Sequence, residues 1–394
     1  MTIYFVAGEV SADNHGAALM RSLRDLDPNL QFIGRGGPQM RQTAGSLFKN
    51  WIGEAAVLGL WEVLRKYGYF REQFGHTIRE ILDSRPDAVV LIDYPGFNLR
   101  LARALRRRSK QQKIIYYISP QVWAWNRGRI KRMARFIDLV LCIFPFEAEL
   151  YNQSGLCAVF VGHPMIERLQ AEKINVEREP NVIGLFPGSR AREVRKIFPI
   201  MIETAHLLLQ HRPALRFKVA AASEQLARQM RNMLPPCASA SENRGAIEVT
   251  VGETAALMQQ AFVGIVASGS ATLEAAYFGM PFVLVYNVAW PTYIAARLVV
   301  NVKFLGMPNL LAGKEVVPEF IQHEASPRAI VTAVRRLIED GHAREHMISN
   351  FDAVTGKLGR VGASERAARA IVEEIGRTAK SEVGTPPHSK SFAK

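Results

Sequence analysis

Short apolar runs alternate with amphipathic helical segments along almost the whole chain, and this alternation limits the possible folds most strongly. An apolar run of strand length followed by a helix is typical of a buried parallel strand and its crossover helix. The pattern restarts at Val182, after a charged stretch at 171–180 that indicates a linker. The sequence therefore predicts an α/β protein with two doubly wound, Rossmann-like domains that face each other across a cleft. The expected strands are 3–7, 31–34, 88–93, 114–118, 139–143, 159–162, 182–186, 216–221, 247–251, 263–267 and 282–286.

The expected domains are residues 1–170 and 181–345. The helices expected at 346–379 have no strands between them, so they could cap either domain or contact a partner chain. The last residues, 380–394, are polar and contain proline, which predicts a disordered tail.

The net charge of +14 indicates an anionic partner: a phosphorylated ligand, an acidic membrane surface or nucleic acid. The 3 cysteines share no metal-ligand spacing, which suits a reducing cytoplasm, and the N-terminal residues do not form a secretion signal. The uncharged stretch 275–296 is cut by glycine and proline, which favours a buried sheet core over a membrane span. No metal site or cofactor is expected, because the one DxD sequence, Asp25 to Asp27, ends a helix before a proline.

Two loops of the second half have the composition of a nucleotide site. In the first, Gly188 and Ser189 form a turn after a strand and Arg190 opens a helix, where a guanidinium can hold a diphosphate. In the second, Gly269 and Ser270 precede a helix that carries Glu274, whose carboxylate could meet ribose hydroxyls. The alternative is an ordinary strand–helix unit in which Glu274 only favours the helix dipole. A further loop at 306–313, with Asn309 and Leu310, can supply backbone contacts.

Asp93 is the candidate for general-base chemistry. It ends a fully apolar strand, where a carboxylate is costly unless it has a role or a partner. It could take a proton from a substrate hydroxyl, or it could act as a helix N-cap or structural acceptor. Glu9 and Ser11, in the loop after the first strand, either contact substrate or only begin the next helix.

Two segments mix apolar, aromatic and basic residues in the manner of a membrane interface. The first, at 54–85, includes Leu58 and Trp61 and is alternatively a buried helix. In the second, at 119–136, basic residues follow two tryptophans, and a second basic helix lies at 103–110. These basic segments suit anionic lipid head groups, nucleic acid or only a solvated helix face. The candidates in the second segment are Trp123, Trp125, Arg127 and Arg129.

Ten motifs in order give the chain a specific resemblance to the lipid-A-disaccharide synthases, from about residue 3 to 376. They are GEVSAD, GGPQM, LGLWEVL, IDYPGFN, SPQVWAW, FPFE, VGHP, PGSR, ASGSATLE and PNLLAG. The resemblance implies a GT-B glycosyltransferase with an N-terminal acceptor domain and a C-terminal UDP-sugar domain. It implies transfer from UDP-2,3-diacylglucosamine to 2,3-diacylglucosamine 1-phosphate, with inversion to a β-1,6 disaccharide 1-phosphate. It also implies lipid A biosynthesis in a Gram-negative cell, a peripheral place on the cytoplasmic face of the inner membrane and no nucleic acid partner. It allows a homodimer.

By the same resemblance Asp93 is the base, and Arg190, Glu274 and Asn309 contact UDP. Three positions depart from the family pattern: Ala12 for glycine, Gly96 for an acidic residue of some members, and Asn287 for arginine. The alternatives are a sugar-nucleotide epimerase of the same architecture, a transferase with another lipid-linked acceptor, or a non-enzymatic binder of acidic membranes or RNA.

Overall fold

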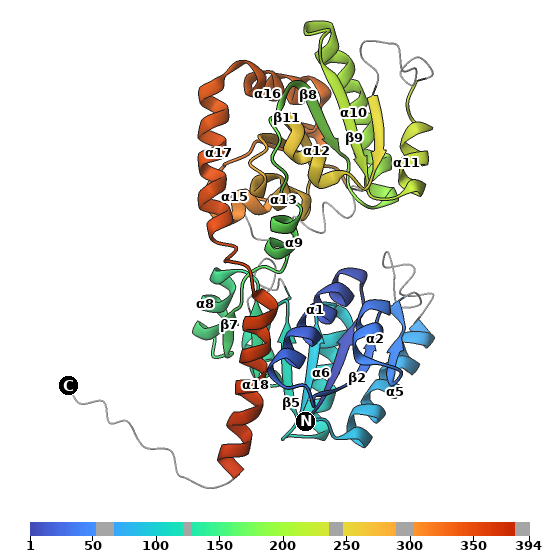
Figure 1. Cartoon of the computed structure of the whole chain (residues 1–394), viewed down its shortest axis with the longest axis vertical. Helices are drawn as coiled ribbons and strands as arrows, with labels where there is room; N and C mark the ends of the chain where they lie inside the picture. The colour runs from blue at the N-terminus through green and yellow to red at the C-terminus, as the bar shows by residue number, and fades with distance from the viewer. Residues whose placement is uncertain (53–66, 121–127, 236–246, 289–302, 383–394) are drawn as a thin grey trace, which may run out of the picture. The chain divides into compact units, whose positions relative to one another are not determined.

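The structure is a computed structural model that describes residues 1–52, 67–120, 128–235, 247–288 and 303–382. It divides into two compact units (Figure 1). The first unit comprises Met1–Pro164 and the chain from Gly359 onward, and the second comprises Met165–Leu358. The C-terminal helices are therefore divided: α17 (Gly341–Gly356) belongs to the second unit and α18 (Ala363–Glu382) to the first. The rest of the expected tail, 383–394, lies outside the described residues.

The sheet of the first unit has seven parallel strands in the order β3-β2-β1-β4-β5-β6-β7. Its central strands are almost wholly apolar because helices cover both faces of the sheet. The strands are β1 (Thr2–Ala7), β2 (Gln31–Gly36), β3 (Phe48–Asn50), β4 (Ala88–Ile92), β5 (Lys113–Tyr117), β6 (Leu139–Cys142) and β7 (Ala158–Phe160).

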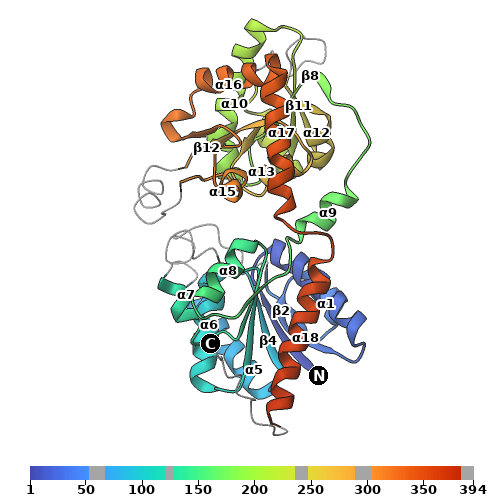
Figure 2. The same cartoon turned by 90° about the vertical axis from the view of Figure 1, so that its left-hand side faces the viewer.

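Alternate residues of these strands enter two separate cores. Ile3 and Phe5 pack with α1, α2 and α18, whereas Tyr4 and Val6 pack with α5, α6, α7 and α8 on the opposite face (Figure 2). This side-chain period of two is what a strand buried on both faces requires. The helices are α1 (Val10–Leu26), α2 (Pro38–Ala44), α5 (Tyr67–Ser84), α6 (Pro95–Arg108), α7 (Gly128–Met133) and α8 (Pro145–Gln153).

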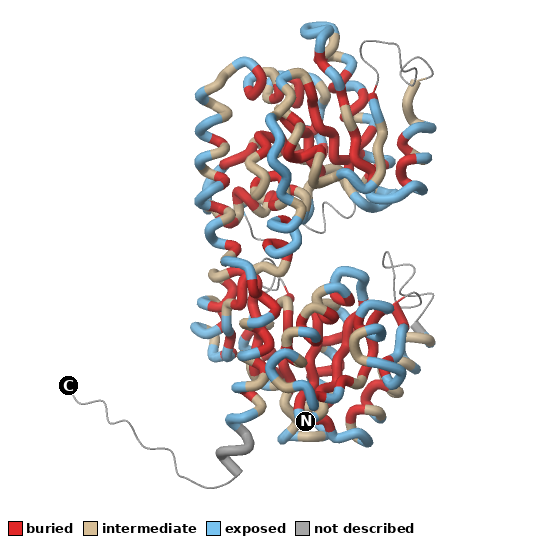
Figure 3. Tube along the Cα trace, viewed as in Figure 1, coloured by how far each residue is buried: buried red, intermediate tan, exposed pale blue. Residues whose placement is uncertain are grey.

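The second unit repeats the architecture with six parallel strands in the order β10-β9-β8-β11-β12-β13. Its buried residues follow the strands and the inner faces of the helices (Figure 3). The strands are β8 (Glu179–Phe186), β9 (Arg216–Ala221), β10 (Ile247–Val251), β11 (Ala261–Ala267), β12 (Phe282–Tyr286) and β13 (Glu319–Ile321). The helical segments are α9 (Met165–Ala171), α10 (Ala191–His211), α11 (Glu224–Arg231), α12 (Thr254–Gln260), α13 (Ala271–Tyr277), α15 (Met307–Ala312), the 3-10 turn η3 (Gln322–Glu324) and α16 (Pro327–Glu339), with α17.

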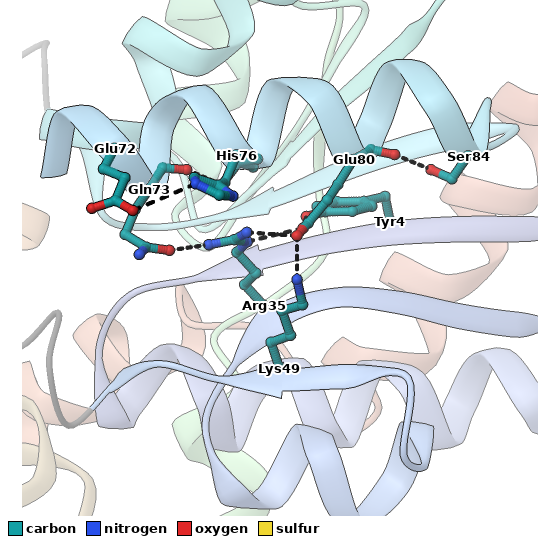
Figure 4. A network of polar contacts seen from close by, with 9 residues as sticks. Tyr4, Arg35, Lys49, Glu72, Gln73, His76, Glu80 and Ser84 are labelled. Carbon is teal, nitrogen blue, oxygen red and sulfur yellow. Dashed lines mark hydrogen bonds and ion pairs between the residues drawn. The ribbon is translucent and has the colours of Figure 1, made fainter. Parts of the chain in front are cut away.

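A buried ion-pair network fixes α5 to the first sheet (Figure 4). Arg35 of β2 is 3% exposed, and its guanidinium donates to both carboxylate oxygens of Glu80, at 2.7 and 3.1 Å. Tyr4 donates to the same carboxylate at 2.8 Å, and Lys49 also pairs with it. Burial alone would raise the pKa of Glu80, but the hydrogen bonds from Arg35, Lys49 and Tyr4 outweigh it and lower the pKa to about 2.

We expect Glu80→Ala to lower the free energy of unfolding, because it leaves the Arg35 guanidinium buried without its main partner. The cost should be about 2–3 kcal/mol, below the 3–5 kcal/mol of a fully buried pair, since Glu80 is 28% exposed. Glu72→Ala is the matched control on α5, because Glu72 is 66% exposed and, among the described residues, pairs only with His76. Urea denaturation measures both variants, and equal stability losses would contradict the role of the network.

The same experiment has a pH signature. The folded pKa of Glu80 lies below its ordinary value of 4.5, so its stabilisation is complete above about pH 4.5 and is lost as the pH falls toward 2. The difference between the parent protein and Glu80→Ala should therefore shrink over this range.

Candidate functional site

Each sheet has one point at which its winding reverses, and the predicted site residues follow the strands that meet there. In the first unit β1 and β4 are adjacent, with Ala7 opposite Ile92. In the second unit β8 and β11 are adjacent, with Phe186 opposite Val266. Loops after two such strands lead away in opposite directions, which leaves a crevice at the carboxyl ends where ligands bind.

At the first of these points Asp93 and Tyr94 both have left-handed backbones, with φ of 46° and 50°. This conformation is unfavourable for residues with a Cβ and persists only where neighbouring contacts enforce it. Here the Asp93 carbonyl accepts hydrogen bonds from the Asn98 amide at 2.8 Å and the Tyr116 hydroxyl at 2.5 Å. The Asp93 N–H donates to the carbonyl of Tyr117 at 3.0 Å. Three hydrogen bonds of the Asp93 main chain thus hold the turn, and they do not involve its carboxylate.

The Asp93 carboxylate is destabilised in its charged form. Burial raises its pKa to about 6, the nearby charge of Glu9 adds to the rise, and a hydrogen bond from the Tyr94 backbone opposes it. Glu9 itself is exposed at the end of β1, and Ser11 is exposed in the first turn of α1. Asp93 is therefore ionised at neutral pH yet basic enough to accept a proton from a hydroxyl group that becomes acidic in a transition state.

Aromatic rings line the side of the turn at Asp93. The Tyr94 ring lies so close to Gly8 that a Cβ on Gly8 would come within 2.4 Å of it. Trp51 contacts Phe97 edge to face at 5.2 Å between ring centroids and Tyr94 at 6.4 Å. These rings give the turn at Asp93 an apolar side.

Several predicted membrane or acceptor residues lie outside the described residues: Leu58, Trp61, Trp123, Trp125 and Arg127. Arg129 lies in α7. None of the described helices is both long and apolar enough to span a bilayer.

The second unit has a pocket of about 770 Å³ at the carboxyl ends of its central strands. It brings together six predicted residues from the loops after β8 and β11 and from the helices that follow. They are Gly188, Ser189, Arg190, Gly269, Ser270 and Glu274.

The loop after β8 is shaped for an anion. Gly188 has a φ of 106°, and a Cβ there would meet the Glu193 carboxylate at 2.5 Å. Arg190 is the N-cap residue of α10, is 64% exposed and pairs with Glu193 at 3.1 Å. A long helix N-terminus with an exposed guanidinium beside it attracts phosphate groups.

Glu274 has a partner that sequence reasoning missed. Its carboxylate is 14% exposed and accepts an ion pair from Arg168 of α9 at 3.1 Å, and Arg168 also pairs with Glu172 at 2.8 Å. Partial burial would lower the pKa of Arg168, but the two carboxylates outweigh it and raise the pKa. Arg168 and Glu172 both line the pocket, so the pair holds Glu274 in place at the pocket wall. No local motif marks Arg168, because α9 is brought to the pocket only by the tertiary fold.

The side chain of Asn309 is hydrogen-bonded to neighbouring residues of its own unit. Its side chain is fully buried, donates to Val317 and Glu319 at 2.8 Å each, and accepts from the N–H groups of Val316 and Val317. These bonds occupy the Asn309 amide, and the contact between this segment and a nucleotide stays a prediction. Neither Asn309 nor Leu310 lines the pocket after β8 and β11.

Within the described part of the chain, no group of three or more His, Cys, Asp or Glu residues is placed to hold a metal ion. Asp25 and Asp27 lie at the end of α1, and Asp27 accepts a hydrogen bond from the Asn29 N–H at 3.0 Å. Because α1 begins after the carboxyl end of β1, its own end lies at the opposite edge of the sheet from Asp93.

Comparison with known proteins gives one consistent family. A sequence profile described as lipid-A-disaccharide synthetase matches residues 3–372. The chain is 38% identical over 384 residues to the lipid-A-disaccharide synthase of Geobacter sulfurreducens, covering 95% of this chain and 97% of that protein. It is 36% identical over 387 residues to the synthase of Pseudomonas paraeruginosa, covering 96% and 99%.

Solved structures with the same fold include enzymes of two kinds. The UDP-GlcNAc 2-epimerase of Neisseria meningitidis, bound to UDP-GlcNAc, has a TM-score of 0.58 at 14% identity and covers 96% of this chain and 100% of its own. The calicheamicin glycosyltransferase has a TM-score of 0.56 at 15% identity and covers 96% and 99%. At such identities the likeness shows the fold alone, which is the two-domain GT-B architecture.

We expect Asp93→Asn to stabilise the protein at neutral pH. Asparagine removes the buried charge, tolerates a left-handed backbone and keeps the carbonyl that Asn98 and Tyr116 contact. The pKa of Asp93 in the folded protein is about 6, above its ordinary value of 3.8. Ionisation of Asp93 therefore lowers the stability of the parent protein increasingly as the pH rises from 4 to 6. The gain should be about 2 kcal/mol above pH 6 and vanish below about pH 4.

Thermal unfolding of both proteins between pH 4 and 8 measures this difference. A difference that is constant across the range, or a loss of stability at pH 7, would contradict the buried charge as its cause.

Proposed function

The chain belongs to the lipid-A-disaccharide synthetase family, and from this premise we propose which of its residues carry out the reaction. It is a glycosyltransferase that forms the lipid A disaccharide, with the GT-B fold. The epimerase alternative is not favoured, because the epimerase structures share only the fold whereas the synthases match at 32–38% identity across the chain.

The substrates we propose are UDP-2,3-diacylglucosamine as donor and 2,3-diacylglucosamine 1-phosphate as acceptor. The family supports this pair. The pocket after β8 and β11 has the size for a UDP-sugar, and Arg190 at the N-terminus of α10 offers positive charge for the diphosphate. Because both substrates carry acyl chains, we also propose that the protein works on the cytoplasmic face of the inner membrane. The net charge of +14 supports attraction to an anionic bilayer. The homodimer stays a prediction.

Asp93 acts as general base in this proposal. Its carboxylate takes the proton of the acceptor 6-hydroxyl as that oxygen attacks the anomeric carbon from the face opposite UDP. The new bond forms as the bond to the β-phosphate oxygen breaks, which inverts the anomeric centre, and the bonding electron pair leaves with UDP. The observation that carries this role is the pKa of about 6 on a carboxylate at the carboxyl end of β4.

Arg190 and the N-terminus of α10 stabilise the charge that develops on the departing diphosphate. The backbone around Gly188 and Gly269 leaves room for phosphate oxygens to approach the chain. Glu274, held by Arg168, accepts hydrogen bonds from the ribose hydroxyls. No step needs a metal ion, since fixed cationic and dipolar groups do this work.

The function is tested by incubating the purified protein with both acylated substrates and detecting the disaccharide 1-phosphate by mass spectrometry. The parent protein should show an acid limb in kcat/KM with a pKa near 6, and Asp93→Asn should lose on the order of 10²-fold or more in turnover.

Glu9→Gln is the control for this assignment. It removes the neighbouring carboxylate, so turnover should persist while the acid limb moves to lower pH. Normal turnover in folded Asp93→Asn, or loss of turnover in Glu9→Gln alone, would reassign the base.

The nucleotide site is tested by isothermal titration with UDP. Arg190→Ala should weaken binding by about 1–2 kcal/mol, toward the low end for a charged hydrogen bond because Arg190 is well exposed. Glu274→Ala should weaken it as well, through the lost ribose contact. Arg195→Ala is the control on α10, since Arg195 is exposed and does not line the pocket. Unchanged affinity in both pocket variants would remove the nucleotide from this site.

A further inference from the structure

Two basic segments of the first unit line a single cavity. It has a volume of about 610 Å³ and is lined by residues of α6 and α7, which contribute nothing to the nucleotide pocket. Figure 2 shows where these two helices lie in the first unit. The two segments are separated by β5 and by residues 121–127 in the sequence, so only the fold brings them together. Nothing in the reaction as described so far uses this cavity.

Seven arginines line it. Four lie on α6, at spacings of three and four residues that place them along one side of the helix. Three come from α7 and the turn after it. The seven are Arg100, Arg103, Arg106, Arg107, Arg129, Arg132 and Arg135.

Most of this charge has no carboxylate partner among the residues that the structure describes. Asp138 pairs with Arg106 at 2.5 Å and also accepts the Ile114 N–H at 2.8 Å, so its capacity is largely used. Guanidinium groups gathered around one volume repel each other, and an anionic ligand would relieve that repulsion. Among the described residues no carboxylate pairs with Arg100, Arg103, Arg107, Arg132 or Arg135.

The remaining lining of the cavity is apolar, and one end of it lies beside the proposed base. Leu99, Met133 and Phe136 contribute the apolar surface. Pro95 and Gly96, which also line the cavity, directly follow the left-handed turn of Asp93 and Tyr94. A ligand with a phosphate group and a hydrocarbon part, and with a hydroxyl at Asp93, matches these surfaces together.

We propose that this arginine groove binds the phosphate of the acylated sugar phosphate that accepts the glycosyl group. The proposal rests on the function argued above and adds the residues that select a phosphorylated acceptor. Arginine suits the task because its planar guanidinium can donate two hydrogen bonds to one phosphate. Seven arginines share the groove, so we expect the loss of one to be partly compensated by its neighbours.

The groove is a concave site that begins at the Asp93 turn, and this favours the acceptor over the surface of a bilayer. Anionic phospholipid head groups carry the same phosphate chemistry, but contact with a bilayer requires no cavity and no continuity with Asp93. If the groove binds the acceptor phosphate, its arginines should matter less for an acceptor without phosphate. If the groove binds phospholipid head groups, its arginines should matter equally for both acceptors.

The test compares two double variants that remove equal charge from the same two helical segments. Arg103→Gln with Arg132→Gln changes the groove. Arg108→Gln with Lys131→Gln is the control, because both residues are exposed and neither lines the cavity. All these side chains are on the surface, so folding should be preserved. Each protein is assayed in neutral detergent micelles with 2,3-diacylglucosamine 1-phosphate and with the same lipid without its phosphate.

The parent protein and the control should prefer the phosphorylated acceptor. The groove variant should lose roughly 10-fold in kcat/KM on that acceptor and keep its rate on the acceptor without phosphate. Its UDP affinity should be unchanged, and the parent's preference should weaken at high salt. Equal losses on both acceptors, or equal losses in the groove variant and the control, would overturn the proposal. So would lost sedimentation with anionic liposomes together with an unchanged acceptor preference, which would assign the arginines to bilayer docking.

Equilibrium binding of the two acceptors to the same micelles separates this proposal from the function on which it rests. If the parent protein forms no disaccharide, the proposed function fails, and binding still reports on the groove. Tighter binding of the phosphorylated acceptor that is lost only in the groove variant supports the phosphate site. Equal binding of both acceptors by the parent protein overturns it.

Discussion

Both sheets consist of parallel strands with helices packed on their two faces, so neither sheet has a face in water. Ligand-binding residues in such a unit are therefore expected in the loops at the carboxyl ends of the strands. The crevice for a ligand forms where the winding of the sheet reverses, between β1 and β4 and between β8 and β11. Asp93 with Glu9 and Arg190 with Ser270 follow these strands, so the proposed catalytic and nucleotide residues share one topological origin.

Carboxylates of the first unit differ in what surrounds them, and this separates structural from functional groups. Asp13 is buried and accepts hydrogen bonds from the N–H groups of Gly37, Gln39 and Met40, each at 2.9 Å. Glu80 is held by two cations and a tyrosine, which lowers its pKa. Asp93 has a raised pKa instead, and no lysine or arginine in the described residues pairs with its carboxylate. The buried charge of Asp93 lowers the stability of the fold, and such a loss is typical of reactive positions. The protein tolerates it because main-chain hydrogen bonds hold the turn whether or not the Asp93 carboxylate is ionised.

Much of the fold could be predicted because long apolar runs leave few alternatives. The eleven expected strands are present, with ends shifted by a few residues. The two that were missed, β3 and β13, are three-residue edge strands whose short mixed sequences carry no periodic signal. Edge pairing of this kind is decided by the neighbouring strand, and not by the residues of the strand itself.

The candidate site could be predicted only as far as local motifs reach. Glycine, serine and arginine after an apolar strand indicated the loop after β8, and the structure places that loop in one pocket with Glu274. Arg168 could not be found this way, because its role depends on where α9 packs. The motif around Asn309 did not reveal that its amide accepts hydrogen bonds from the N–H groups of Val316 and Val317. A motif identifies a segment, but the contacts decide what each side chain in it does.

The contacts of each arginine also decide its role, and the arginines contribute much of the net charge of +14. Arg35 and Arg178 are partly or wholly buried and donate to Glu80 or to main-chain carbonyls, so their charge serves the fold. In the proposed nucleotide pocket Arg168 and Arg190 each pair with a carboxylate, which would reduce the attraction for a diphosphate that must leave after every turnover. Among the described residues, most guanidinium groups of the groove along α6 and α7 have no carboxylate partner. This positive charge would offset the repulsion between the Asp93 carboxylate and a phosphorylated acceptor.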